Sequence, residues 1–544
     1  MSGTPLPRAQ ALELMAAGAC QVAYDKSDYK FCTKSEWRQV CAQASKQYIR
    51  PRSNTPVPTK YETYRLKQML QGLVLGPLDK NGGETWAMCP ILYQEGLTSL
   101  YNKNTGYAPI HPWKCSANQC ARWKCDITKH CINPNPPPQI SKGSKMDIVK
   151  AWKHVYTTRK WKAYGSFNTK GDINVPYVLL KAKKVVDPVV RQLEYKKMRP
   201  IAPSTKHPLS QVLHRAGRAW YFLSTVLPGE HFVLNRCDEV PKKLDEANKK
   251  FEGHIAILNQ DIEGCFPNMP QNTIKEAARW ACQAFAHSGL KGVWVPKQGK
   301  KLKCTFAPHH AQWKYIWMPF SALLELLDFS LDNALVEMPN GDILKQRIGV
   351  PMGGAISPGA TVITLAFMEQ RYLASISTFD KENLIALRYM DDLLTVIHTK
   401  SNHIVETYKN VQIYEGDLRL ETTTPFTFLE TWLEVNTQGK ITYRLKNDNE
   451  WCLEPKIWRY QHWHSGASYT LKRGILLATL KKVDRMASDP SQLFISATEK
   501  IREFSHKQYP PGTIGFACNV MYNTTGNWMW KRIKAACGCF PNIS

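Results

Sequence analysis

The chain has 544 residues, of which 43% are hydrophobic, so it is long enough to bury a large core in two to four domains. Its 72 lysines and arginines exceed its 45 aspartates and glutamates, and the net charge of +27 makes an acidic polymer the expected partner. No apolar run approaches the roughly 18 residues of a membrane span, and no secretory signal pattern opens the chain, so we expect neither membrane insertion nor secretion.

The N-terminal part combines an extension over residues 1–59 with a cysteine-rich insert over residues 111–145. Sixteen cysteines without a secretory signal are expected to be reduced thiols. Soft ligands of the kind that hold a structural zinc gather in the insert. They are Cys115, Cys120, Cys125, His130 and Cys131. Because the spacing between these cysteines is looser than in zinc fingers, unconnected thiols remain the alternative to a zinc site.

Lysines and arginines interleave with apolar residues between positions 146 and 226, a pattern that suits contact with phosphates. Lys181, Lys184 and Arg199 lie in this segment. They are candidates for holding a triphosphate, which needs cations around its charged oxygens. A run of charges more often forms a solvated surface, and that simpler interpretation stays open.

An apolar run that begins near residue 255 predicts a strand with Asp261 at its end. Ile255 and Ile257 alternate with smaller residues along it. Phe266 follows five residues after Asp261, where its ring could lie beneath the sugar of a nucleotide and exclude a 2′-hydroxyl. The simpler interpretation of Phe266 is an ordinary core aromatic.

A glycine- and proline-rich loop over residues 349–358 precedes a helical pattern over 359–375. Glycines let backbone approach a base pair closely, and Pro358 suits the first turn of a helix. Met352 and Gly353 lie at the centre of this loop and are candidates for contact with a nucleotide.

Tyr389, Met390, Asp391 and Asp392 lie between two apolar runs, which predicts a hairpin with paired carboxylates at its tip. Two negative charges forced together favour a divalent cation. With Asp261 on another strand, these carboxylates form the ordered set that two-metal phosphoryl transfer requires. A single aspartate would more often be an exposed turn residue.

Basic helical patterns return over residues 468–487 and 491–508. They predict a small helical domain that grips a duplex.

These motifs together resemble motifs A, B and C of reverse transcriptases. Their amino-acid sequences are most similar to those of the Penelope-like retroelement enzymes, which are related to telomerase. Residues 261–270 (DIEGCFPNMP) resemble the family's D-V-x-x-L-Y-T-N-I-P, and Met352-Gly353 stands where this family has Met-Gly. Further similar stretches cover residues 78–93, 180–184, 199–201, 428–430, 464–474 and 507–510. The resemblance therefore extends over roughly residues 60–525.

The resemblance implies an α+β fold of the right-hand polymerase type, with fingers, a palm built on an antiparallel sheet and a helical thumb. Its implied boundaries are an N-terminal extension at 1–59, fingers at 60–253, a palm with fingers segments at 254–452 and a thumb at 453–544.

The implied activity is RNA-directed DNA polymerisation that extends a DNA 3′ end with two Mg²⁺ ions. The catalytic residues would be Asp261, Asp391 and Asp392, with Ile262 beside Asp261 and Asp391 at the metals. The implied nucleotide-binding residues are Lys181, Lys184, Arg199, Phe266, Met352, Gly353 and Tyr389. The expected partners are an RNA template, a DNA primer or target end, deoxynucleotides and the element's own RNA, and the expected location is the nucleus.

The chain departs from the family pattern at several positions. Phe266 replaces a tyrosine and Leu180 a proline. No lysine after the hairpin matches the family's general acid convincingly, and Arg419 is the nearest candidate for that role. No GIY-YIG endonuclease follows the thumb pattern, which resembles the endonuclease-lacking branch of the family or a truncated product. The alternatives are a viral-type RNA-dependent RNA polymerase, against which Phe266 argues, and a non-catalytic nucleic-acid-binding relic, against which the carboxylates argue.

Overall fold

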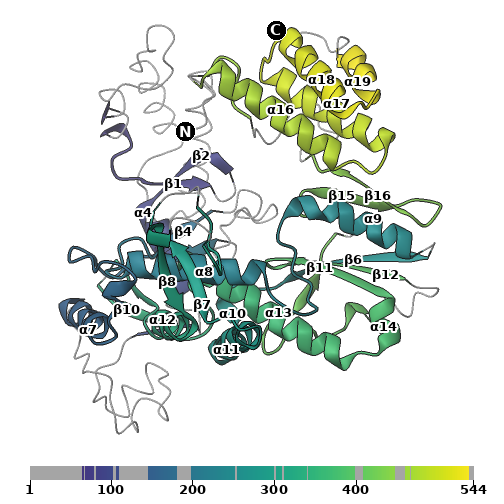
Figure 1. Cartoon of the computed structure of the whole chain (residues 1–544). Helices are drawn as coiled ribbons and strands as arrows, with labels where there is room; N and C mark the ends of the chain where they lie inside the picture. The colour runs from purple at the N-terminus through teal and green to yellow at the C-terminus, as the bar shows by residue number, and fades with distance from the viewer. Residues whose placement is uncertain are drawn as a thin grey trace.

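The computed structural model describes most of the chain from residue 64 onward (Figure 1). The described residues are 64–65, 68–78, 81–101, 106–109, 145–180, 198–251, 254–298, 302–308, 312–339, 341–398, 408–424, 426–447, 460–465 and 467–537. The predicted N-terminal extension and the cysteine-rich insert lie outside them, as do Lys181 and Lys184. Among the helices of these ranges, none has the length and apolar character to cross a membrane.

The part of the chain before residue 251 consists of helices and short antiparallel strands. They are β1 (Val74–Leu78), β2 (Asn81–Met88), α4 (Pro90–Tyr101), β3 (Tyr107–Pro109), α7 (Lys145–Thr158), β4 (Tyr177–Leu179), β5 (Arg199–Ile201), α8 (Ser210–Thr225) and α9 (Val240–Lys250). Strand β1 pairs with β2 and β4 with β5, while β3 joins a sheet with strands from later in the chain.

The middle of the chain mixes helices and strands. Its elements are β6 (Ile255–Ile262), α10 (Cys265–Asn268), α11 (Gln271–His287), β7 (Gly292–Pro296), β8 (Tyr315–Pro319), α12 (Phe320–Asp332), β9 (Leu335–Glu337), β10 (Ile343–Gln346), α13 (Ser357–Ser375), α14 (Thr378–Glu382), β11 (Leu384–Tyr389), β12 (Asp392–His398), β13 (Leu420–Thr422), β14 (Thr427–Phe428), β15 (Thr431–Val435) and β16 (Ile441–Leu445). Within the described part of the chain, the sheets have the orders β11-β12-β6-β13, β3-β10-β9, β14-β15-β16 and β7-β8. The predicted α+β class is confirmed.

The sheet β11-β12-β6-β13 is antiparallel, and both faces of its central strands are covered. Along β12, Leu393 and Ile397 pack into the core that contains α11 and α13, whereas Leu394 and Val396 pack with α9 and the β14-β15-β16 sheet. Because side chains alternate between the two faces of a strand, a strand buried on both sides must be apolar throughout. This explains the continuous apolar run that predicted the strand.

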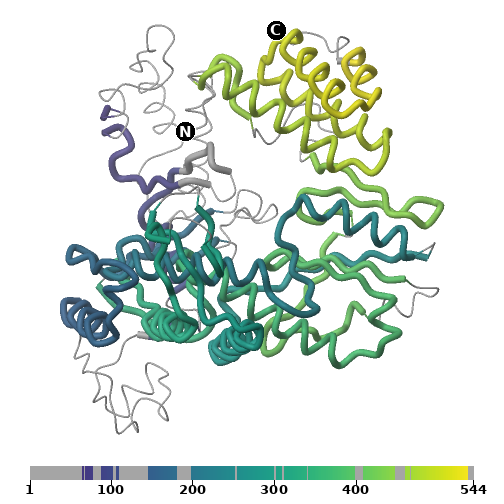
Figure 2. The backbone as a smooth tube through the Cα atoms, viewed as in Figure 1, coloured from purple at the N-terminus to yellow at the C-terminus, as the bar shows by residue number. Residues whose placement is uncertain are grey.

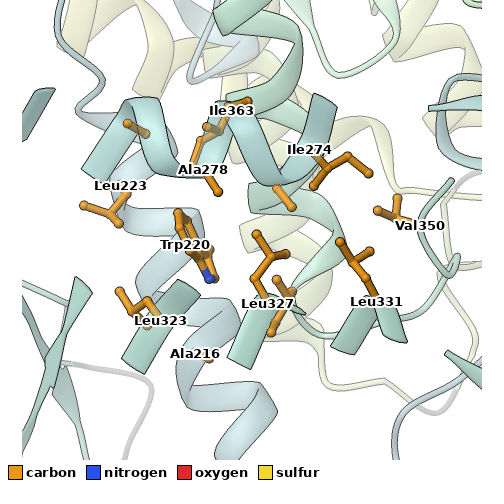
Figure 3. Close-up of a cluster of buried hydrophobic side chains, with 14 of the residues drawn as sticks. Ala216, Trp220, Leu223, Ile274, Ala278, Leu323, Leu327, Leu331, Val350 and Ile363 are labelled. Carbon is orange, nitrogen blue, oxygen red and sulfur yellow. The ribbon is translucent and has the colours of Figure 1, made fainter. Parts of the chain in front are cut away.

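A core of helices packs against this sheet. Figure 3 shows some of its buried side chains. Trp220 of α8 is fully buried at its centre, with Leu327 of α12, Ala278 of α11 and Ile363 of α13 around it. The core joins helices from both sides of the 255–262 strand in the sequence, so it sets the position of β6 relative to α13.

The C-terminal helices form a bundle, drawn in yellow in Figure 2. They are α16 (Tyr469–Arg485), α17 (Pro490–His506), α18 (Pro511–Thr525) and α19 (Met529–Cys537). The side chains of Ser468 and Asp489 cap α16 and α17 by accepting hydrogen bonds from first-turn N–H groups, as N-cap residues typically do. The bundle has a core of its own, so both predicted basic helices belong to one packed unit.

Candidate active site

The strand β6 brings Asp261 into line with two other carboxylates. In the sheet register, Asp261 lies directly opposite Asp392 of β12 on one side and opposite Glu421 of β13 on the other. Residues directly opposite one another in a sheet present their side chains on the same face, and like charges in such positions repel. The register of the three strands therefore concentrates negative charge at this end of the sheet.

Asp391 joins this row through the turn of the β11-β12 hairpin. Tyr389 pairs with Asp392, so the turn is formed by Met390 and Asp391, and Met390 has a positive φ of 57°. The N–H of Ile262 donates a hydrogen bond to the backbone carbonyl of Asp391 at 2.9 Å. The turn that contains Asp391 is thus tied to the end of β6, the strand that carries Asp261.

The buried thiol of Cys265 lies close to both aspartates. Burial, which is the largest cause, and the neighbouring charges of Asp391 and Asp261 together raise its pKa to about 12, although Arg388 acts in the opposite direction. Cys265 therefore stays a neutral thiol beside the carboxylates. The side chain of Ile262 is buried, so only its backbone could take part in a metal site.

The donor set fits Mg²⁺, which prefers oxygen ligands and is usually held by one or two carboxylates together with waters and substrate phosphates. Among the described residues, no group of three or more histidine, cysteine, aspartate or glutamate side chains is arranged to hold a metal ion. Asp261 and Asp391 supply carboxylate oxygens, which are the kind of ligand that Mg²⁺ prefers.

Phe266 lies in the short helix α10, which begins just after β6. Gly264, with φ of 58°, precedes the helix and turns the chain. Phe266 is half-buried, and its carbonyl accepts a hydrogen bond from the N–H of Val350 at 2.8 Å. The N–H of Gly349 donates to the carbonyl of Met269 at 2.8 Å. The segment that carries Phe266 is therefore fastened to the start of the 349–358 loop.

Gly349 is expected to be irreplaceable at this junction. It has φ of 75°, and an added Cβ would collide with the carbonyl oxygens of Phe266 and Pro267. Gly349→Ala should therefore lower the free energy of unfolding by more than the roughly 1–2 kcal/mol that a left-handed backbone costs. Gly341→Ala is the matched control, because Gly341 has φ of 84° and open space around its Cβ position. Equal losses in the two variants in denaturant unfolding would contradict close packing at Gly349.

The loop residues Met352 and Gly353 lie against the end of β5. The N–H of Ala202 donates to the carbonyl of Met352 at 2.7 Å, and the Ser204 hydroxyl donates to the carbonyl of Gly353 at 3.2 Å. Arg199 begins β5, so the structure brings the strand of Arg199 to the same loop that contacts Phe266. Tyr389 is half-buried, and burial and the neighbouring Cys237 raise its pKa.

Two features near the site have no counterpart in the sequence prediction. Glu421 occupies an exposed position next to Asp261, and only strand pairing reveals it. In the basic helix α16, Lys482 forms an ion pair with Glu430, and Arg485 lies 3.8 Å from a carboxylate oxygen of Asp238. These two cations connect the helical bundle to the sheet region rather than facing only solvent.

The comparisons with known proteins bear on the fold. No protein-family model matches the chain, and no curated protein matches it. Among solved structures, the chain is similar to telomerase from Candida albicans in complex with a TWJ fragment of telomeric RNA, with 12% identity over 99% of this chain and 87% of that one and a TM-score of 0.52. Apo telomerase from Candida tropicalis aligns at 11% identity over 95% and 80% with a TM-score of 0.43. The RNA-dependent RNA polymerase of a sicinivirus aligns at 12% identity over 71% and 67% with a TM-score of 0.32. The first likeness shows that the chain has an α+β polymerase fold like that of telomerase.

Proposed function

We propose that this protein is an RNA-directed DNA polymerase of the Penelope-like type that extends a DNA 3′ end. The observation that carries the proposal is the register of the sheet, which lines up Asp261 with Asp392 and ties the turn of Asp391 to the end of β6. The resemblance of the motifs to the Penelope-like enzymes supports the choice of template and product.

In the proposed reaction, the primer 3′ oxygen attacks the α-phosphorus of a deoxynucleoside triphosphate and pyrophosphate leaves. Mg²⁺, when bound, would lower the pKa of the attacking hydroxyl and offset the charge that develops on the phosphate oxygens. Asp261 and Asp391 would hold the Mg²⁺ ions at the end of the sheet. Asp392, opposite Asp261 in the register, adds negative charge beside them.

The residues around the carboxylates provide a site for the nucleotide. Phe266 bounds the space next to Asp261, and the backbone of Met352 and Gly353 forms a surface on which a base pair could rest. Arg199 supplies a cation from the neighbouring strand, and such cations bind phosphate oxygens through charge-assisted hydrogen bonds. We propose this arrangement as the nucleotide site.

Primer extension on an RNA template tests the proposal. The purified chain, an RNA template with an annealed DNA primer, Mg²⁺ and either deoxy- or ribonucleotides are the components. Extension with deoxynucleotides and little with ribonucleotides is the expected result. Efficient RNA synthesis would identify a viral-type RNA polymerase instead, and no extension with either nucleotide set would leave a non-catalytic binding protein.

Arg199 is expected to act on the nucleotide rather than on the template. Arg199→Gln should raise the KM for deoxynucleotides about tenfold, because one charge-assisted contact contributes roughly 1.5 kcal/mol. The Kd for primer–template should change far less. Lys242→Gln, on the exposed side of α9, removes the same charge and serves as the control. Equal weakening of nucleotide and template binding by Arg199→Gln would show that Arg199 contacts only the nucleic-acid backbone.

A further inference from the structure

A charged pair lies fully buried beneath the catalytic hairpin. Arg388, the residue before Tyr389, forms an ion pair with Glu369 of α13, and both side chains have 0% exposure. A second contact joins Arg388 Nη2 to a carboxylate oxygen of Glu369 at 3.3 Å. A buried ion pair seldom stabilises a protein more than apolar side chains of the same volume would, so its presence calls for another role.

The remaining hydrogen-bonding groups of Glu369 have partners. Its carboxylate accepts hydrogen bonds from the Tyr414 hydroxyl at 2.9 Å and from the N–H of Phe232 at 3.0 Å. Burial and the charge of Glu369 raise the pKa of Tyr414 well above its usual value, so Tyr414 remains a donor. The network therefore holds the carboxylate in one position, and a satisfied buried network specifies one arrangement of the surrounding backbone.

Arg388 connects this network to the catalytic turn. Its Nη1 donates a hydrogen bond to the carbonyl of Met390 at 2.9 Å, and its Nη2 donates to the carbonyl of Val362 in α13 at 3.3 Å. Met390 has φ of 57°, a left-handed conformation that persists only where the surroundings enforce it. The guanidinium thus holds the backbone of the residue directly before Asp391.

We propose that Arg388 and Glu369 are positioning residues that fix the Met390–Asp391 turn and so hold the Asp391 carboxylate against Asp261. The pair also links the turn to α13, the helix that follows the 349–358 loop. The inference deepens the proposed function and, in its effect on catalysis, rests on it.

The double variant Arg388→Met/Glu369→Gln removes both charges at nearly constant volume, and the glutamine oxygen can still accept a hydrogen bond. We expect it to keep a cooperative melting transition. At saturating primer–template, its kcat should fall about tenfold or more, as a misplaced catalytic group typically does, and the Mg²⁺ concentration for half-maximal rate should rise. Hydrogen–deuterium exchange should become faster in peptides that cover residues 384–398 and stay unchanged in α16–α19.

Two further variants complete the test. Arg388→Lys keeps the buried positive charge but has a single ammonium in place of the guanidinium fork, so we expect it to show the same losses. It takes the place of the double variant in the test if the double variant does not fold. Lys145→Met/Glu337→Gln removes another ion pair, whose atoms lie 2.6 Å apart between α7 and β9, and should leave kcat and the Mg²⁺ requirement unchanged.

The outcomes separate the inference from the proposed function. Wild-type kcat, Mg²⁺ requirement and exchange over 384–398 in both the double variant and Arg388→Lys would overturn the positioning role. If the wild-type protein extends no primer, the proposed function is overturned. Faster exchange of residues 384–398 in the variants would then still support the inference that Arg388 and Glu369 fix the Met390–Asp391 turn.

Discussion

Replacing Asp391 with alanine is expected to lower the rate of primer extension about a thousandfold. The turn places Asp391 beside Asp261, and removal of either carboxylate would take away a ligand that holds positive charge at the reacting phosphate. A loss of several kcal/mol of transition-state stabilisation, about 4 kcal/mol here, corresponds to this factor. The measurement is single-nucleotide extension at saturating primer–template.

The controls for Asp391→Ala separate charge from fold. Asp392→Asn should be milder if Asp392 acts only indirectly, and Asp417→Asn, in an exposed loop before β13, should retain nearly full activity. Both the melting temperature and the primer–template Kd of Asp391→Ala should stay close to the wild type. An Asp391→Ala enzyme that keeps more than about a tenth of the wild-type rate, a barrier change below about 1.4 kcal/mol, would remove Asp391 from the metal site.

The elements that carry the site could be predicted because their signals are local. An apolar run ending in Asp261 predicted β6, and two apolar runs around Tyr389–Asp392 predicted the hairpin of β11 and β12. All three strands are present. The sequence predicted that Asp261 and Asp391 lie close together only because two-metal phosphoryl transfer needs carboxylates from separate strands at one point. The register that places Glu421 opposite Asp261 depends on pairing between distant segments, which sequence periodicity does not specify.

The buried network illustrates the same limit. Arg388 is a single charged residue at the end of an apolar strand, and that pattern alone signals a buried partner. Nothing in the sequence identifies Glu369 as this partner, because α13 must first pack across the sheet. The cations of α16 were predicted to face a duplex, yet Lys482 pairs with Glu430. Charge patterns show where cations lie along a helix but not which carboxylates the fold brings to them.

Phe266→Ala is expected to raise the incorporation of ribonucleotides relative to deoxynucleotides. The ring follows β6 by one short turn, and the hydrogen bond from Val350 fixes its backbone next to the carboxylates. A ring against the C2′ atom leaves no room for a hydroxyl, and forcing one in would cost roughly 1–3 kcal/mol, as overpacking generally does. The discrimination from this contact is therefore about 5- to 150-fold, and the ratio of kcat/KM values for the matched nucleotide pair measures it.

Truncation of an aromatic side chain also weakens packing and can slow the incorporation of both nucleotides. The ratio of the kcat/KM values for the deoxynucleotide and the ribonucleotide is therefore more informative than either value alone. Phe367 of α13 is half-buried against the same core, and Phe367→Ala supplies the matched loss of a ring. Both variants should lose stability, but only Phe266→Ala should change the preference for the sugar, because a general loosening slows both nucleotides alike. An unchanged ratio in Phe266→Ala would make Phe266 a core residue. The preference for DNA synthesis would then need another barrier to the 2′-hydroxyl, and the resemblance of the motifs would be its remaining support.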